Sequence, residues 1–276
     1  MKVGFVDYYL GEWHANHLPD ILKKISGDLK TDVQLAYAWA EREPSPVDGE
    51  TTDGWCRKFG AERCTTIAEL CEKSDGIVIL SPTNPEYHLG YAKQVLPFGK
   101  PTFIDKPVAV NEAEAREIFA LAEKYHAPCY SSSALRYARE LKDVKAPTFI
   151  ATTGGITTYE EYIIHQIEMV VATLGIGATG VRAVKMGELV HFEISYPDAR
   201  SANMTMTGDP MMPFTAILGN AKERKFREIT SDFFYDAYAD MVRFFADGKV
   251  SFDPAEVMEV AKIRDMTLAA VKSIGL

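Results

Sequence analysis

The sequence predicts an α/β protein: an N-terminal doubly wound parallel sheet followed by a C-terminal α+β domain with an open, mostly antiparallel sheet. Up to about residue 130, strand-like segments alternate with helical ones, which is typical of parallel sheets. Between residues 181 and 218, strand-like segments follow one another without helices. The 276 residues suit one or two domains, and we place the boundary between 1–145 and 146–276.

One β-α-β unit organises the first domain. The apolar, β-branched run 77–80 predicts a buried parallel strand. Apolar residues at helical spacing over 87–96 predict a helix, and 102–104 predicts the next strand. The crossover between parallel strands is almost always right-handed, so both strands open at the same edge of the sheet. We therefore expect the loop 81–84 and Lys106 to face one ligand site.

The remaining elements follow from the same periodicities. In the first domain we expect strands at 2–6, 33–39 and 128–130, and helices at 13–25, 54–59, 67–71 and 111–125. Asn111 and Glu114 form a capping box at the start of the last of these helices. In the second domain we expect strands at 148–153, 181–186, 189–196, 202–207 and 214–218, and helices at 159–174, 234–245 and 254–274.

Composition and charge exclude some classes of binding partner. The chain has 30 basic and 39 acidic residues, and its net charge of −9 argues against a general nucleic-acid or anionic-membrane binder. No apolar run approaches the roughly 20 residues of a membrane helix. The N-terminus leads directly into a strand, and the four cysteines form no CxxC pair. We therefore expect free thiols and a cytoplasmic protein.

Two motifs carry a family resemblance. The segments 79–88 (ILSPTNPEYH) and 103–107 (FIDKP) are similar to the loop and strand end of the glucose-fructose oxidoreductase/inositol dehydrogenase (Gfo/Idh/MocA) family, as is the pattern Glu161-x3-His165-x2-Glu168. The resemblance implies a Rossmann-like first domain and NAD or NADP as cofactor. It also implies a sugar, cyclitol or related polyol as the small-molecule substrate. The C-terminal sheet would form a homodimer or homotetramer.

The resemblance also assigns roles to individual residues. Lys106 would hydrogen-bond the substrate hydroxyl beside the nicotinamide. His165 would act as the general base, and Glu161 would orient its ring. The expected cofactor-binding residues lie at the edge of the first sheet: Asp7, Tyr8, Ser81, Thr83, Asn84, His88 and Lys106.

The first turn departs from the family pattern. Asp7, Tyr9 and Glu12 stand where the dinucleotide fingerprint G-x-G-x-x-G has glycines, which let the backbone approach the pyrophosphate. An alternative is therefore the same fold without dinucleotide binding, acting as a non-catalytic ligand-binding or regulatory protein. A metal-dependent enzyme using Asp7, His14 and His17 is a third alternative, although we expect no metal.

Overall fold

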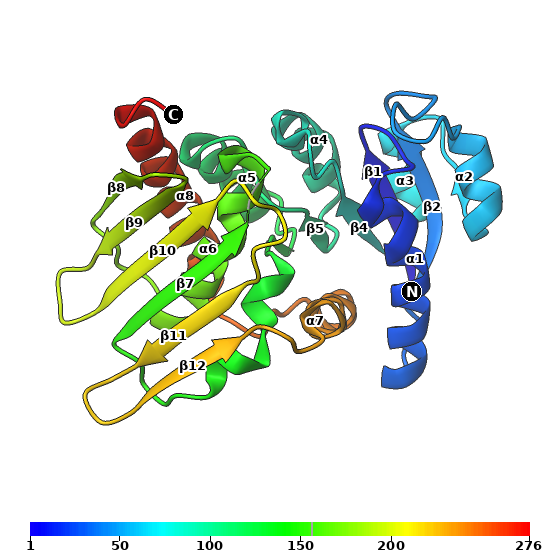
Figure 1. The fold of residues 1–276 in the computed structure, drawn as a ribbon. Helices are drawn as coiled ribbons and strands as arrows, with labels where there is room; N and C mark the ends of the chain where they lie inside the picture. The colour runs from blue at the N-terminus through cyan, green and yellow to red at the C-terminus, as the bar shows by residue number, and fades with distance from the viewer. Residues whose placement is uncertain (156) are drawn as a thin grey trace. The chain divides into compact units, whose positions relative to one another are not determined.

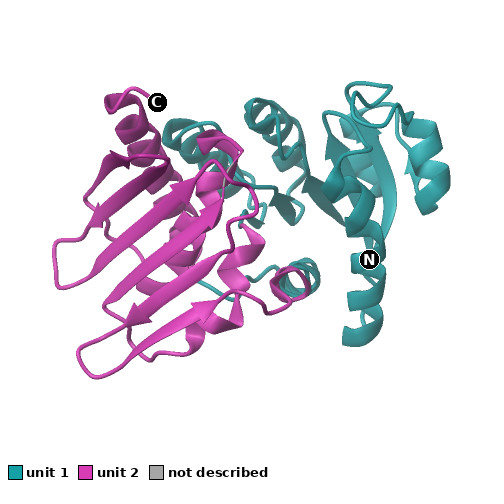
Figure 2. Cartoon of the chain, viewed as in Figure 1, with its two compact units in different colours: residues 1–132, 238–252 teal, residues 133–237, 253–276 magenta. Residues whose placement is uncertain are grey.

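The structure is a computed structural model and describes residues 1–155 and 157–276. It contains two compact units, residues 1–132 with 238–252 and residues 133–237 with 253–276 (Figure 2). The chain thus returns to the first unit late in the sequence, through the second half of one helix and the loop after it. The domain boundary expected at residue 145 stays a prediction.

The first unit is built on a six-stranded, fully parallel sheet, sheet A, in the order β3-β2-β1-β4-β5-β6 (Figure 1). This order is that of the Rossmann fold and confirms the predicted class. Ligands of such sheets bind at the carboxyl ends of β1 and β4, where the strand order reverses. The strands are β1 (Lys2–Asp7), β2 (Gln34–Ala40), β3 (Glu62–Arg63), β4 (Gly76–Ile79), β5 (Thr102–Ile104) and β6 (Cys129–Tyr130).

Helices connect these strands, and all of them except α4 (His88–Val95) begin at a side-chain cap. Asn111 accepts a hydrogen bond from the backbone N–H of Glu114, as the capping motif predicted. Thr51 and Thr66 cap the second and third helices in the same way. The helices are α1 (Trp13–Leu29), α2 (Thr52–Phe59), α3 (Ile67–Lys73), α4 (His88–Val95) and α5 (Glu112–Lys124), with 3-10 turns at Pro85–Tyr87 and Leu96–Phe98.

The core of the first unit fixes the sheet edge that carries the site. Phe5 of β1 packs against Trp55 of α2, with ring centroids 6.1 Å apart, and both side chains are inaccessible to solvent. Tyr130 of β6 packs edge-on against Phe244 at 4.7 Å. Phe244 lies in α7 (Phe233–Asp247), whose second half belongs to this unit. Burial of each such side chain contributes about 1.5–3 kcal/mol.

The second unit contains sheet B, six strands in the order β12-β11-β7-β10-β9-β8. Only β7 and β10 pair in parallel, which confirms the mostly antiparallel sheet. The strands are β7 (Phe149–Gly155), β8 (Gly180–Met186), β9 (Leu189–Ser195), β10 (Ser201–Thr207), β11 (Thr215–Gly219) and β12 (Arg224–Glu228). Its helices are α6 (Tyr159–Leu174) and α8 (Ala255–Ser273), with 3-10 turns at Ala134–Tyr137 and Arg139–Lys142.

Two strands were not predicted, and both lie at sheet edges. β3 has only two residues, and β12 reads Arg-Lys-Phe-Arg-Glu, a charged segment without an apolar run. Short, charged strands are a common way to protect a sheet edge, so the hydrophobic pattern does not show them. Among the described residues, no helix has the length and apolarity required to cross a membrane.

Candidate active site

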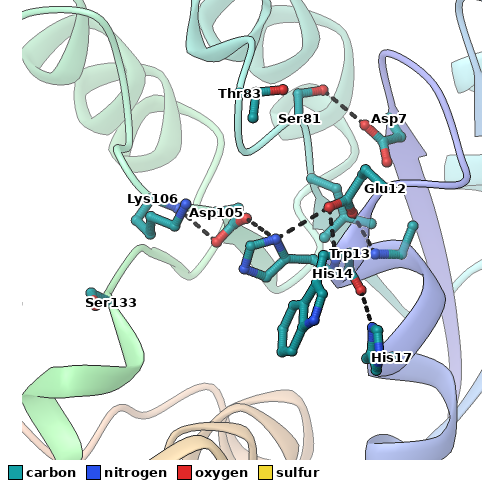
Figure 3. A network of polar contacts seen from close by, with 12 residues as sticks. Asp7, Glu12, Trp13, His14, His17, Ser81, Thr83, Asp105, Lys106 and Ser133 are labelled. Carbon is teal, nitrogen blue, oxygen red and sulfur yellow. Dashed lines mark hydrogen bonds and ion pairs between the residues drawn. The ribbon is translucent and has the colours of Figure 1, made fainter. Parts of the chain in front are cut away.

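The first strand ends in a buried carboxylate at the carboxyl edge of sheet A. Asp7 is 1% exposed, and its Oδ1 accepts hydrogen bonds from the N–H of Tyr8 (2.7 Å) and the hydroxyl of Ser81 (3.1 Å) (Figure 3). Ser81 follows β4, so this contact joins the strands at which the sheet order reverses. Burial, and then the charge of Glu12, raises the pKa of Asp7 well above its usual range. Asp7 is therefore a candidate proton carrier.

Glu12 is the N-cap of helix α1, and its side-chain carboxylate caps the helix. Oε2 accepts a hydrogen bond from the N–H of His14 (2.7 Å), and Oε1 accepts one from the N–H of Ala15. The positive end of the helix dipole stabilises an anion at this position. The carboxylate therefore takes the place at which helices of this fold type receive a phosphate.

His14 lies between two carboxylates. Its Nδ1 is 3.2 Å from Oε2 of Glu12 and 3.6 Å from Oδ2 of Asp105 (Figure 3). Burial lowers the pKa of His14, but the two carboxylates raise it by more, so the net shift is upward. An imidazole held in this way can store and release a proton near neutral pH.

Lys106 follows β5, at the same sheet edge as Ser81. Its backbone N–H donates to Oδ1 of Asp105 (2.8 Å), and its side chain is half-buried. Within residues 1–155 and 157–276, no carboxylate lies within ion-pair distance of its ammonium group. The first unit thus combines an ammonium, an imidazole and carboxylates at one sheet edge, which is a set suited to acid–base chemistry.

Aromatic rings connect the loops after β1 and β4. Tyr8 stacks on Tyr87 with ring centroids 4.2 Å apart. The hydroxyls of Tyr9 and Thr83 lie 3.4 Å apart at the surface, and the Asn84 amide is hydrogen-bonded within its own loop. The structure therefore brings Tyr8, Thr83 and Asn84 to the edge where the sequence analysis expected them.

His88 is buried beneath this edge. Its Nε2 lies 2.6 Å from the carbonyl oxygen of Leu80, and its Nδ1 lies 3.0 Å from that of Pro107. The side chain is fully inaccessible, and burial lowers its pKa. The imidazole thus ties the end of β4 to the segment after Lys106, which favours a structural role for His88 over ligand contact.

His165 lies on α6 in the second unit. Its Nδ1 is 2.7 Å from the hydroxyl of Ser133, and the backbone N–H of Ser133 donates to buried Glu168 (2.9 Å). Glu168 also accepts from Nε of Arg136 (2.6 Å). A buried network therefore holds the residue that contacts the imidazole. The orienting role of Glu161, one turn before His165, stays a prediction.

The turn after β1 does not fit the pyrophosphate of a dinucleotide in the manner of the glycine fingerprint. The N–H groups that begin α1 are already occupied by Glu12, and Asp7 adds a second buried carboxyl. A Cβ on Gly11 would lie 2.5 Å from Oδ1 of Asp48, so no open space lies above that glycine. A contact of Asp7 or Tyr8 with a cofactor stays a prediction, and at this turn it would differ from the usual geometry.

The side chains at this turn also bear on metal binding. In the part of the chain that the structure describes, no group of three or more His, Cys, Asp or Glu side chains could hold a metal ion. His17, from the alternative metal set, has its Nδ1 2.6 Å from the carbonyl oxygen of Trp13 and stacks on the Trp13 ring.

Sequence reasoning missed the grouping of Glu12, His14 and Asp105. The available signal was the spacing Asp7-x4-Glu12-x-His14, which puts ionisable residues where the family has glycines. The contact of His14 with Asp105 joins distant parts of the chain, so only the fold shows it.

The strand order of sheet A places the first unit in the class of Rossmann folds. Residues 16–132 match the profile of the GFO_IDH_MocA family, described as an oxidoreductase family with an NAD-binding Rossmann fold. This match confirms the resemblance to that family. The match begins after the turn that carries Asp7 and Glu12. No curated protein matches the chain.

Solved structures share the fold over nearly the whole chain. UDP-N-acetylglucosamine 3-dehydrogenase from Acidithiobacillus ferrooxidans is 13% identical with a TM-score of 0.77, over 99% of this chain and 98% of that one. A protein of gentamicin A biosynthesis, in complex with NAD, is 13% identical with a TM-score of 0.75, over 99% and 95%. An NAD-binding oxidoreductase from Klebsiella pneumoniae is 14% identical with a TM-score of 0.76, over 99% and 97%.

Proposed function

We propose that the protein is an oxidoreductase that moves a hydride between NAD or NADP and a hydroxyl of a sugar, cyclitol or related polyol. The observation that carries the proposal is the position of Lys106 at the carboxyl end of β5, beside the Asp105–His14 pair. The family of residues 16–132 and the fold shared with dehydrogenases support it.

Oxidation of an alcohol requires removal of the hydroxyl proton as well as of the hydride, which the bound cofactor accepts. Lys106 donates a hydrogen bond to the substrate oxygen and stabilises its developing negative charge. His165 takes the hydroxyl proton, and Ser133 fixes which ring nitrogen is available. Asp105 holds the backbone N–H of Lys106, and His14, beside Asp105, supplies a nearby imidazole that can carry a proton.

A specific observation favours a second candidate. Glu12 fills the anion position at α1, so the same fold could serve as a non-catalytic ligand-binding or regulatory protein. In that case the hydroxyl-binding edge would remain, and no turnover would occur. The C-terminal sheet would mediate a homodimer or homotetramer in either case.

The test is NAD(P)-linked turnover on a panel of sugars and cyclitols. Lys106→Ala and His165→Ala should each lower kcat by about 10²–10⁴-fold while the melting curve stays cooperative. Glu117→Ala, at an exposed ion pair with Lys93, is the matched control and should retain the wild-type rate. Unchanged turnover in either active-site variant would refute the assigned role.

A further inference from the structure

We infer that Glu12 is a built-in substitute for a bound phosphate, and that it closes the N-terminus of α1 to the diphosphate of a dinucleotide. The inference takes from the proposed function only the class of ligand, which is a dinucleotide. It makes Glu12 the residue that determines whether a diphosphate can bind at the β1–α1 turn.

The hydrogen-bond donors of this helix end are already occupied. The first N–H groups of a helix have no partner within the helix, and in dinucleotide-binding folds they receive the diphosphate. In this chain the N–H groups of His14 and Ala15 donate to the Glu12 carboxylate, which is 6% exposed. A phosphate would have to displace this carboxylate before it could reach them.

Charge at the turn also opposes a diphosphate. Asp7 is 1% exposed, and its Oδ2 has no hydrogen-bond partner within the described residues. The Asp48 carboxylate lies close to Gly11, since a Cβ on that glycine would be 2.5 Å from its Oδ1. The carboxylates of Glu12 and Asp48 therefore lie at the turn where a ligand with two or more negative charges would bind, and their charge opposes its binding.

Side chains also connect the loops next to this turn. The stack of Tyr8 on Tyr87 connects the loops after β1 and β4, the two strands between which a dinucleotide normally passes. Glu41, which follows β2 where an acid commonly holds the adenine-side ribose, accepts a hydrogen bond from the Tyr91 hydroxyl (2.7 Å). The chain's own side chains thus satisfy the groups that a dinucleotide would use.

The experiment removes the internal anion and measures a gain of binding. NADH binding is followed by fluorescence and inorganic pyrophosphate binding by calorimetry. Glu12→Ala should bind both at least about tenfold more tightly than wild type, because two helix N–H groups become free and one negative charge is lost. Asp20→Ala removes the same charge from an exposed position of α1 and should change neither affinity.

A second variant keeps the test informative if loss of the helix cap in Glu12→Ala destabilises the protein. Glu12→Gln removes the charge but keeps an amide oxygen for the cap, so it should melt like wild type and bind pyrophosphate more tightly than wild type. If Glu12→Ala melts without cooperativity, Glu12→Gln decides the result. Equal or weaker pyrophosphate binding in a folded Glu12 variant would overturn the inference.

The outcomes separate this inference from the proposed function. Tighter binding in the Glu12 variants, with no turnover by wild type on any polyol, would support the inference and refute the proposed function. Turnover by wild type, with NADH and pyrophosphate affinities that do not respond to Glu12, would support the proposed function and overturn the inference.

Discussion

The buried side chain of Asp7 belongs to the candidate site and also affects the stability of the folded protein. It stands at the end of β1, where a glycine would leave space for a ligand, and it is hydrogen-bonded to Tyr8 and Ser81. Its carboxyl is buried beside Glu12, and burial is the first cause of its raised pKa. The charged form of Asp7 is therefore costly in the folded protein.

This cost predicts a pH-dependent effect of Asp7→Asn. A carboxyl whose folded-state pKa is raised stabilises the fold below its unfolded pKa, and this contribution is lost as pH rises through the folded pKa. We expect Asp7→Asn to unfold at a higher urea concentration than wild type at alkaline pH. The difference should shrink toward pH about 4, by up to about 1.4 kcal/mol per pH unit.

Urea midpoints measured across this pH range check the prediction, with Asp20→Asn as an exposed control on α1. A difference between Asp7→Asn and wild type that is the same at every pH would contradict it.

At the scale of elements, a buried ion pair anchors the 3-10 turn Ala134–Tyr137 to α6. Arg136 donates through Nε to Glu168 at 2.6 Å, and it also contacts Glu256 at the start of α8. The Arg136 and Glu168 side chains are 4% and 3% exposed. This pair supports Ser133, and through Ser133 the imidazole of His165.

Arg136→Met should cost about 3–5 kcal/mol of unfolding free energy, because Glu168 would remain buried without its partner. Arg182→Met, which breaks an exposed pair with Glu193, should cost less than about 1 kcal/mol. Equilibrium urea denaturation of both variants gives the comparison. Equal losses in the two variants would show that the buried network does not hold this turn.

The elements also show which parts of the fold could be predicted. The range 159–174 was predicted for a helix, and α6 spans Tyr159–Leu174, because a threonine cap and a glycine bracket its apolar stripe. β12 escaped prediction because its residues are mostly charged. Lys106 and Ser81 were placed at one edge because strand ends follow from topology. The capping role of Glu12 was missed because the spacing of residues does not show in which direction a side chain points.

At the scale of the whole molecule, sheet B carries exposed apolar side chains, and we propose that it mediates self-association. Ile217 of β11 and Phe226 of β12 are cross-strand partners, 47% and 61% exposed. We expect a dimer or tetramer in sedimentation velocity, and Phe226→Glu should shift it toward the monomer because a charge would replace apolar contact area. Lys222→Gln, at an exposed position in the turn before β12, changes the net charge by the same one unit and is the control. A wild-type monomer at micromolar concentration would contradict this expectation.

The proposed oxidoreductase function and the carboxylate at the first turn can be tested together. The experiment is a titration of the wild-type protein with NAD and with NADP, followed by the shift in melting temperature. We expect saturable stabilisation by one of the two dinucleotides, with a weak dissociation constant of about 1 mM, at the upper end of ordinary substrate affinities. No stabilisation by either dinucleotide at several times that concentration would contradict the oxidoreductase assignment, and saturation at micromolar concentration would contradict the closed turn.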